Sequence, residues 1–166
     1  MKKIVQQNDP VLRQKAKTVP LSDIGSVKIE KVIKEMSESL ASCEDGVAIA
    51  APQIGVGLRI FVVSKKIFKD GEEDAVFINP EIIKLSKKKS ELDEGCLSVR
   101  WIYGKTKRAD KASVKALDQQ GNPFTWNGSG LIAQIFQHEI DHLDGILFVD
   151  HATDLHEHKI NESESN

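Results

Sequence analysis

Two stretches of the chain carry hydrophobic residues at the spacing of a helix that buries one face. The first begins near Asp23, and its apolar residues lie three or four positions apart, at Ile29, Val32, Ile33, Met36 and Leu40. We expect this helix to end within 44–46, where Gly46 can adopt the left-handed conformation that closes many helices.

The second helical stretch places apolar residues and two histidines on the same side. This stripe consists of Leu131, Ile135, His138 and His142. Its two apolar members should turn the histidines toward the interior. We expect the glycine-rich segment 127–130 to be a loop before this helix and Gly145 to end it.

Strand patterns lie between the two helical stretches. Residues 58–63 and 75–78 are apolar runs, and an Asn-Pro dipeptide should close the second. Residues 112–117 alternate between apolar and polar, and after a turn the chain returns at 124–126, which predicts a hairpin. One early helix, central strands and one late helix predict an α+β fold rather than a parallel α/β sheet.

The length of 166 residues is that of one domain. We expect this domain to cover residues 1–150, followed by a polar tail over 151–166 that is frayed from 161 onward. Prolines at 10 and 20 bracket a segment that should run extended over the surface, because residues before proline avoid the helical conformation.

Charge and hydropathy exclude several classes of function. Lys and Arg total 23 against 25 Asp and Glu, a net charge of −2 with histidine neutral. This balance argues against a nucleic-acid partner, sequence-specific recognition included. No apolar run approaches the ~20 residues of a membrane helix. The first residues do not resemble a secretory signal, so we expect a cytoplasmic protein without a membrane partner.

Residues 138–142 read His-Glu-Ile-Asp-His, an H-E-x-x-H pattern on the second helix. Positions four apart on a helix differ by about 40°, so His138 and His142 project from one face and can bind one metal ion. Glu139 lies a third of a turn away, where it can reach water without being a ligand. The alternatives are two histidines hydrogen-bonded in the core or lying on a solvated face, and the apolar stripe disfavours the second. Buried imidazoles need partners, however, and a metal supplies them.

A catalytic site of the zinc type usually has three protein ligands, so one is missing from this pattern. Cys96, within Glu-Gly-Cys-Leu-Ser at 94–98, is the soft donor that can complete it. The glycine before it lets the backbone approach a ligand. A small buried hydrophobic role is the alternative for a single cysteine, and we assign that role to Cys43.

A third segment, 46–55, combines small residues, a proline and a lone amide. Backbone of this kind can lie close to a bound molecule, although such segments often serve packing alone. Gln53 can offer its side-chain NH₂ to an anionic oxygen.

Together these segments resemble the three signature motifs of the peptide deformylase family, in the family's order. They are Gly-Val-Ala-Ile-Ala-Ala-Pro-Gln-Ile-Gly at 46–55, Glu-Gly-Cys-Leu-Ser at 94–98 and Gln-His-Glu-Ile-Asp-His-Leu at 137–143. Weaker similarities at 9–13, 107–109 and 130–135 extend the resemblance over about residues 4–149.

The resemblance implies an α+β domain whose antiparallel sheets pack around a central helix carrying the H-E-x-x-H motif. It implies a metal-dependent hydrolase that removes the N-formyl group from the N-terminal methionine of newly made polypeptides and releases formate. By position, the metal ligands would be Cys96, His138 and His142. Glu139 would be the general base and acid, while Gln53 and the backbone N–H of Leu97 would hold the oxyanion.

The implied cofactor is one divalent metal ion, Fe²⁺ in the cell, with Zn²⁺, Ni²⁺ or Co²⁺ able to take its place. The implied partners are N-formylmethionyl nascent polypeptides and the region of the ribosome where they emerge, in a bacterial cytoplasm. The substrate should lie along Gly46, Val47 and Ala48, with Arg100 near its second or third side chain.

Two of these positions depart from the family's pattern. Ala48 stands where the family has a second glycine, which requires a negative φ there. Arg100 stands where the family has a proline. Its charge should raise kcat/KM for peptides with acidic side chains by up to about fivefold. Surface drift without effect and a catalytically impaired, deformylase-like metal-binding protein are the alternatives. A metalloprotease, which H-E-x-x-H alone would allow, is disfavoured by the cysteine motif.

Overall fold

The computed structural model describes residues 1–158, so the expectation of a frayed end at 161–166 falls outside it. The described residues form two α-helices, α1 (Val27–Ala41) and α2 (Leu131–Leu143). They also form eight strands: β1 (Ala48–Ala50), β2 (Ile60–Val63), β3 (Ala75–Leu85), β4 (Lys89–Gly95), β5 (Ile102–Ala109), β6 (Lys111–Leu117), β7 (Pro123–Ser129) and β8 (Thr153–Glu157). Neither helix of this part of the chain is long and apolar enough to cross a membrane.

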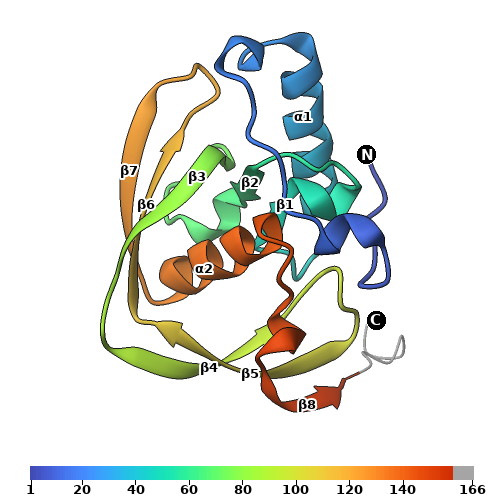
Figure 1. Cartoon of the computed structure of the whole chain (residues 1–166), viewed down its shortest axis with the longest axis vertical. Coiled ribbons are helices and arrows are strands. Elements are labelled where there is room, and N and C mark those ends of the chain that lie inside the picture. The colour runs from blue at the N-terminus through green and yellow to red at the C-terminus, as the bar shows by residue number, and fades with distance from the viewer. Residues whose placement is uncertain (159–166) are drawn as a thin grey trace.

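The strands form two sheets around α2. Five strands pair in the order β1-β2-β3-β6-β7, three pair in the order β4-β5-β8, and all these pairings are antiparallel. Figure 1 shows α2 between the two sheets, with α1 packed at the far side of the larger one. The expected α+β fold, with antiparallel sheets around the H-E-x-x-H helix, is confirmed.

Strand β2 explains how the larger sheet holds a helix on each face. Successive side chains of a strand point to opposite faces. Phe61 and Val63 pack in the cluster with α2, whereas Ile60 and Val62 pack in the cluster with α1. All four are fully buried, which is why this strand reads as a continuous apolar run.

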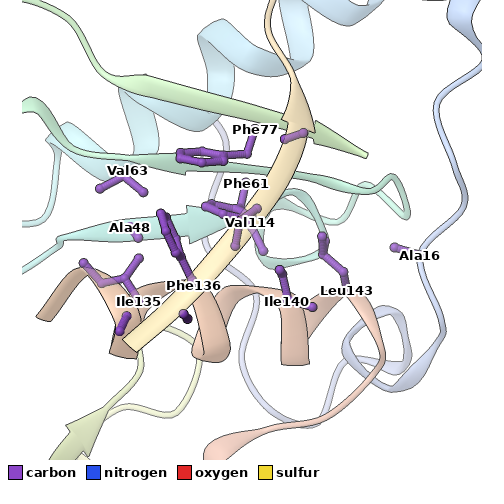
Figure 2. Close-up of a cluster of buried hydrophobic side chains, with 14 residues drawn as sticks. Ala16, Ala48, Phe61, Val63, Phe77, Val114, Ile135, Phe136, Ile140 and Leu143 are labelled. Atoms are coloured by element: carbon purple, nitrogen blue, oxygen red, sulfur yellow. The ribbon is translucent and has the colours of Figure 1, made fainter. Parts of the chain in front are cut away.

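Three phenylalanines fix α2 against the sheet (Figure 2). The rings of Phe61 and Phe77 stack with centroids 4.4 Å apart, and Phe136 of α2 meets Phe77 edge-on at 5.3 Å. Each is fully buried, and burial of such a side chain contributes about 1.5–3 kcal/mol. This contact directs one side of α2 into the core and leaves its other side for the histidines.

Two further features set the position of α2. Gln137 is buried, and its amide accepts from the N–H of Ala109 at 2.9 Å and donates to the carbonyl of Ala109 at 3.0 Å. Gly145 follows the helix with φ +77°, and a Cβ there would lie 2.7 Å from the carbonyl oxygen of Arg13. Glycine therefore ends this helix as expected.

The predicted end of the first helix was wrong. Helix α1 starts after Ser26, whose hydroxyl caps it, and ends at Ala41. Ser42 keeps a right-handed helical conformation, and the N–H of Gly46 closes the next turn on the carbonyl of Cys43 at 3.1 Å. Gly46 is not in the left-handed region, because a turn rather than a glycine cap ends this helix.

Strand β3 does not stop at the Asn-Pro dipeptide, so the prediction that this dipeptide ends the strand was wrong. Asn79 takes φ +50°, and its amide exchanges two hydrogen bonds with the backbone of Val19, at 2.8 and 2.9 Å. A register shift between Ile78 and Glu81 accommodates the proline, which lacks an N–H. The strand bends here and continues.

Three other segments have a different structure from the one that the sequence predicted. Pro10–Arg13 form a 3₁₀ turn rather than extended chain, because the Asp9 carboxylate caps it and Leu12 is fully buried. Residues 127–129 end strand β7 and are not a loop. Residues 153–157, in the expected polar tail, are exposed but pair with β5 as strand β8.

Candidate functional site

The H-E-x-x-H helix turns its two histidines to one side. In α2, the Nε2 atoms of His138 and His142 lie 3.2 Å apart, and the ring centroids lie 4.9 Å apart. Ile135, one turn earlier, is buried, whereas Leu131 is half exposed. Leu131 therefore does not point inward as expected, because the first turn of α2 lies at the wall of a surface cleft.

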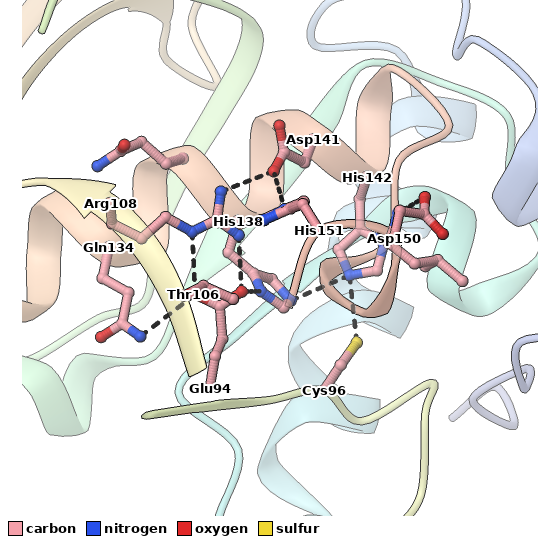
Figure 3. Close-up of polar contacts among 12 residues, drawn as sticks. Glu94, Cys96, Thr106, Arg108, Gln134, His138, Asp141, His142, Asp150 and His151 are labelled. Carbon is pink, nitrogen blue, oxygen red and sulfur yellow. Dashed lines mark hydrogen bonds and ion pairs between the residues drawn. The ribbon is translucent and has the colours of Figure 1, made fainter. Parts of the chain in front are cut away.

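Cys96 approaches the histidines from the turn after β4 (Figure 3). Its Sγ lies 3.3 Å from His142 Nε2, and the donor atoms of Cys96, His138 and His142 all lie within 4.8 Å of one another. Nitrogen and sulfur ligands at tetrahedral angles around one zinc-sized ion would be about 3.3–3.6 Å apart. The donor set thus fits one ion. Cys43 packs at the end of α1, outside this group.

Glu94 holds His138 from the buried end of β4 (Figure 3). Its Oε2 lies 3.0 Å from His138 Nδ1, and the carboxylate accepts from Arg108 at 2.6 and 3.0 Å. Burial acts to raise the pKa of Glu94, but the hydrogen bonds from His138 and Arg108 outweigh it and hold that pKa well below its usual range. The ionised carboxylate can only accept, so His138 Nδ1 carries a proton toward Glu94, and Nε2 is the nitrogen whose lone pair can bind a metal ion.

Arg108 connects β5 to the helix that carries the histidines. It is buried, and its second amino group donates to Asp141 at 2.7 Å, a residue of α2 between the two histidines. Sequence reasoning gave neither Glu94, Arg108 nor Asp141 a role, although all three lie within or beside the motif segments. The sequence did show an acidic residue, Glu94, two positions before the cysteine. Its role could not be inferred, because its partner Arg108 lies 14 positions away in the chain.

Glu139 lines the cleft and has one buried oxygen without a partner among the described residues. Its side chain is buried, and Oε2 has no hydrogen-bond partner within the described part of the chain. Burial raises the pKa of Glu139 to about 7. A carboxyl group with this pKa can both take up and release a proton near neutral pH.

Gln53 is held rigidly beside the cysteine. Its Oε1 accepts from the N–H of Ala50 at 2.8 Å, and its Nε2 lies 3.1 Å from Ser98 Oγ and 3.6 Å from Cys96 Sγ. Leu97 follows the cysteine in the same turn, and its carbonyl accepts from a side-chain amide at 3.0 Å. The Gln53 amide therefore lies beside the cysteine, while the role of the Leu97 N–H as a second donor stays a prediction.

A cleft of about 310 Å³ opens beside this group, and all residues expected to bind substrate line it. These are Gly46, Val47, Ala48 and Arg100. Ala48 is in strand β1 and outside the left-handed region, as a residue with a Cβ requires. The guanidinium of Arg100 is already paired with the carboxylate of Asp45.

A second reason for a glycine at position 95 is the space that a neighbouring ring occupies. A Cβ at this position would lie 2.6 Å from the ring of Tyr103, its cross-strand neighbour on β5. The glycine therefore makes room for this ring, which itself lines the cleft; close approach of its backbone to a ligand stays a prediction.

Comparison with known proteins shows which family this chain belongs to. A family model described as polypeptide deformylase matches residues 1–158. The chain belongs to the polypeptide deformylase family. The resemblance noted from the three motifs is thereby confirmed over the whole described part of the chain.

Relatives in the deformylase family are similar along nearly their full length. A peptide deformylase of Dehalococcoides mccartyi is 43% identical over 151 residues, which cover 91% of this chain and 86% of that protein. A solved peptide deformylase from Legionella pneumophila is 42% identical, with a TM-score of 0.84 over 93% of this chain and 87% of that one. A class I type b peptide deformylase from Acinetobacter baumannii, solved with Met-Ala-Ser bound, is 33% identical, with a TM-score of 0.82 over 90% and 97%.

Proposed function

We propose that this protein is a metal-dependent peptide deformylase, which removes the N-formyl group from the N-terminal methionine of newly made polypeptides and releases formate. One observation carries the proposal: a thiol and two imidazole nitrogens converge within 4.8 Å beside a cleft whose wall includes the unpartnered carboxyl of Glu139. Family membership supports the same reaction, and the Acinetobacter baumannii relative was solved with a peptide that begins with methionine.

In this proposal Cys96, His138 and His142 hold one divalent ion. A mixed sulfur and imidazole set suits iron and zinc, and we propose Fe²⁺ in the cell, with Zn²⁺, Ni²⁺ or Co²⁺ also able to occupy the site. When bound, the ion supplies Lewis-acid polarisation of the formyl carbonyl and lowers the pKa of water. Glu94 orients His138 for this role through its Nδ1.

Glu139 moves the protons of the reaction. As a carboxylate it takes a proton from the water that attacks the formyl carbon. When the carbon–nitrogen bond breaks, the protonated Glu139 gives that proton to the methionine nitrogen. The formic acid so formed gives up its remaining proton, so the products are formate and a protonated amino terminus, and Glu139 returns to its starting state. Its pKa of about 7 suits both transfers.

Gln53 and Leu97 stabilise the negative charge that develops on the formyl oxygen. The bond from Ala50 to its oxygen holds the Gln53 amide in place, so its NH₂ group is already positioned beside the cysteine. The backbone N–H of Leu97 is the second donor. Loss of one such donor typically costs ~3 kcal/mol of transition-state stabilisation.

The substrate peptide is proposed to run along Gly46, Val47 and Ala48 toward Arg100, all of which line the cleft. N-formylmethionyl nascent chains in the bacterial cytoplasm are the proposed partner, and the exit region of the ribosome is a second one. Co-sedimentation with ribosomes at low and high salt tests the second partner.

The proposed function is tested by coupling metal analysis to a formate assay. Protein purified without oxygen should contain about one metal ion per chain and release formate from formyl-Met-Ala-Ser. Full metal content without formate release would instead support the impaired, metal-binding alternative. Glu139 and Gln53 count against that alternative, because a purely structural metal site needs neither. Cleavage of an internal peptide bond would indicate a metalloprotease.

A further inference from the structure

An ion pair joins two segments of the chain that line the cleft. Asp45 lies in the turn after α1, and Arg100 lies in the turn after Cys96. The guanidinium donates two hydrogen bonds to the carboxylate, Nη1 to Oδ2 at 2.6 Å and Nη2 to Oδ1 at 3.1 Å. Both residues line the cleft. A two-point contact of this kind fixes both distance and orientation.

Other contacts hold Arg100 in this position. Its backbone N–H donates to Gln6 Oε1 at 3.2 Å, and the Gln6 amide donates to the carbonyl of Leu97 at 3.0 Å. Its guanidinium carbon lies 4.3 Å from the centroid of the Trp101 ring. The Arg100 side chain is only 21% exposed, against 47% for Asp45. Its charge therefore has little freedom to turn toward a peptide.

The other carboxylates that line the cleft, apart from Glu139, are also paired with basic side chains. Asp93 pairs with Lys105 at 3.1 Å, and Glu94 pairs with Arg108 at 2.6 Å. The walls, as far as the described residues show, thus present paired charges and leave one unpartnered acid.

We propose that the Asp45–Arg100 pair sets how this enzyme responds to charge in its substrates: while the pair is intact, acidic and basic side chains after formylmethionine are accepted alike. A substrate carboxylate can bind Arg100 only by replacing Asp45, so it exchanges one ion pair for another. This inference rests on the proposed function, and it differs from the expectation that Arg100 favours acidic peptides. Either residue alone becomes a selective charge once its partner is removed.

The test compares kcat/KM for formyl-Met peptides that carry Glu or Lys at the second and third positions, at low salt. The wild-type ratio should lie within about twofold of one. Asp45→Asn should raise the Glu-to-Lys ratio about two- to fivefold, and Arg100→Gln should lower it by a similar factor. The swap of both charges, Asp45→Arg with Arg100→Asp, should return the ratio toward one. High salt should weaken each preference.

A matched control is Arg13→Gln, which breaks another two-point pair, to Asp150 at 2.7 and 3.0 Å, outside the cleft. It should leave the ratio unchanged. Single variants that leave the ratio unchanged, or shift it in the same direction, would overturn the inference. The Kd ratio of unformylated Met-Ala-Glu and Met-Ala-Lys tests the pair without turnover. A wild-type enzyme that releases no formate would refute the proposed function alone.

Discussion

Replacing Glu94 by glutamine tests whether this carboxylate holds the candidate metal ligands in place. The substitution preserves the shape of the side chain and removes its charge. A glutamine amide presents an NH₂ group where His138 or Arg108 now donates, so at least one of these contacts is lost. Arg108 keeps its other partner, Asp141 at 2.7 Å.

The expected magnitude follows from the burial of this pair. Glu94 and Arg108 have side chains only 4% and 6% exposed. Removing one member of a buried charge pair costs about 3–5 kcal/mol of stability. Because Arg108 keeps its contact to Asp141, we expect this variant to lose about 3 kcal/mol. For a domain of this size that is a fall in Tm of roughly 6–12 °C. Loss of the group behind His138, a candidate metal ligand, should also weaken metal affinity by about 10–100-fold.

Urea unfolding of the metal-free protein measures the loss of stability, and competition with a chelating dye measures the loss of metal affinity. Asp93→Asn is the control, because this neighbour of Glu94 is 84% exposed and pairs with Lys105 at the surface. It should leave stability and metal affinity unchanged. If Glu94→Gln behaves like Asp93→Asn in both assays, the reasoning about this network is refuted.

Cys96→Ala should lose most bound metal and nearly all formate release, whereas Cys43→Ala should keep both; full metal occupancy in Cys96→Ala would exclude it as a ligand. Glu139→Ala should retain metal, and its kcat should fall beyond the ~10²–10⁴ of a single acid–base group, because one residue serves both transfers. A metal-free variant would assign Glu139 a structural role. Arg13→Gln should destabilise the fold at neutral pH and less so in acid. The hydrogen bond from Arg13 lowers the pKa of Asp150, so the pair stabilises the fold above the unfolded pKa of ~3.9 and loses this effect as pH falls through the lower folded value. Urea unfolding at pH 7 and pH 3 measures this, and an equal difference at both would contradict it.

The sequence predicted those parts of the site whose geometry a single element determines. The relation of His138 to His142 depends only on the pitch of one helix, and Gly145 marked the end of that helix. The hairpin of β6 and β7 was predictable for a similar reason, because its alternation and its turn are local.

Strands β4 and β5 were not predicted, because polar residues occupy their buried face. Glu94, Thr106 and Arg108 are all buried and bond to one another across the strands. A rule that expects apolar residues inward cannot identify such a strand. The partner of Arg100 was missed because Asp45 lies 55 positions earlier in the chain. The course of β3 depends on Val19, 60 positions before Asn79.

Helix α2 belongs to the interior and to the site at once. Phe136 and Ile140 pack in the core, while His138 and His142 face the cysteine from the same backbone. In a close-packed interior, a change of volume beside Phe136 shifts the helix as a whole. In evolutionary terms, the interior of this protein and its chemistry do not vary independently. Substitutions in the core that stability alone would tolerate are subject to selection on turnover as well. The interior should therefore diverge more slowly than that of a domain whose functional residues lie on loops.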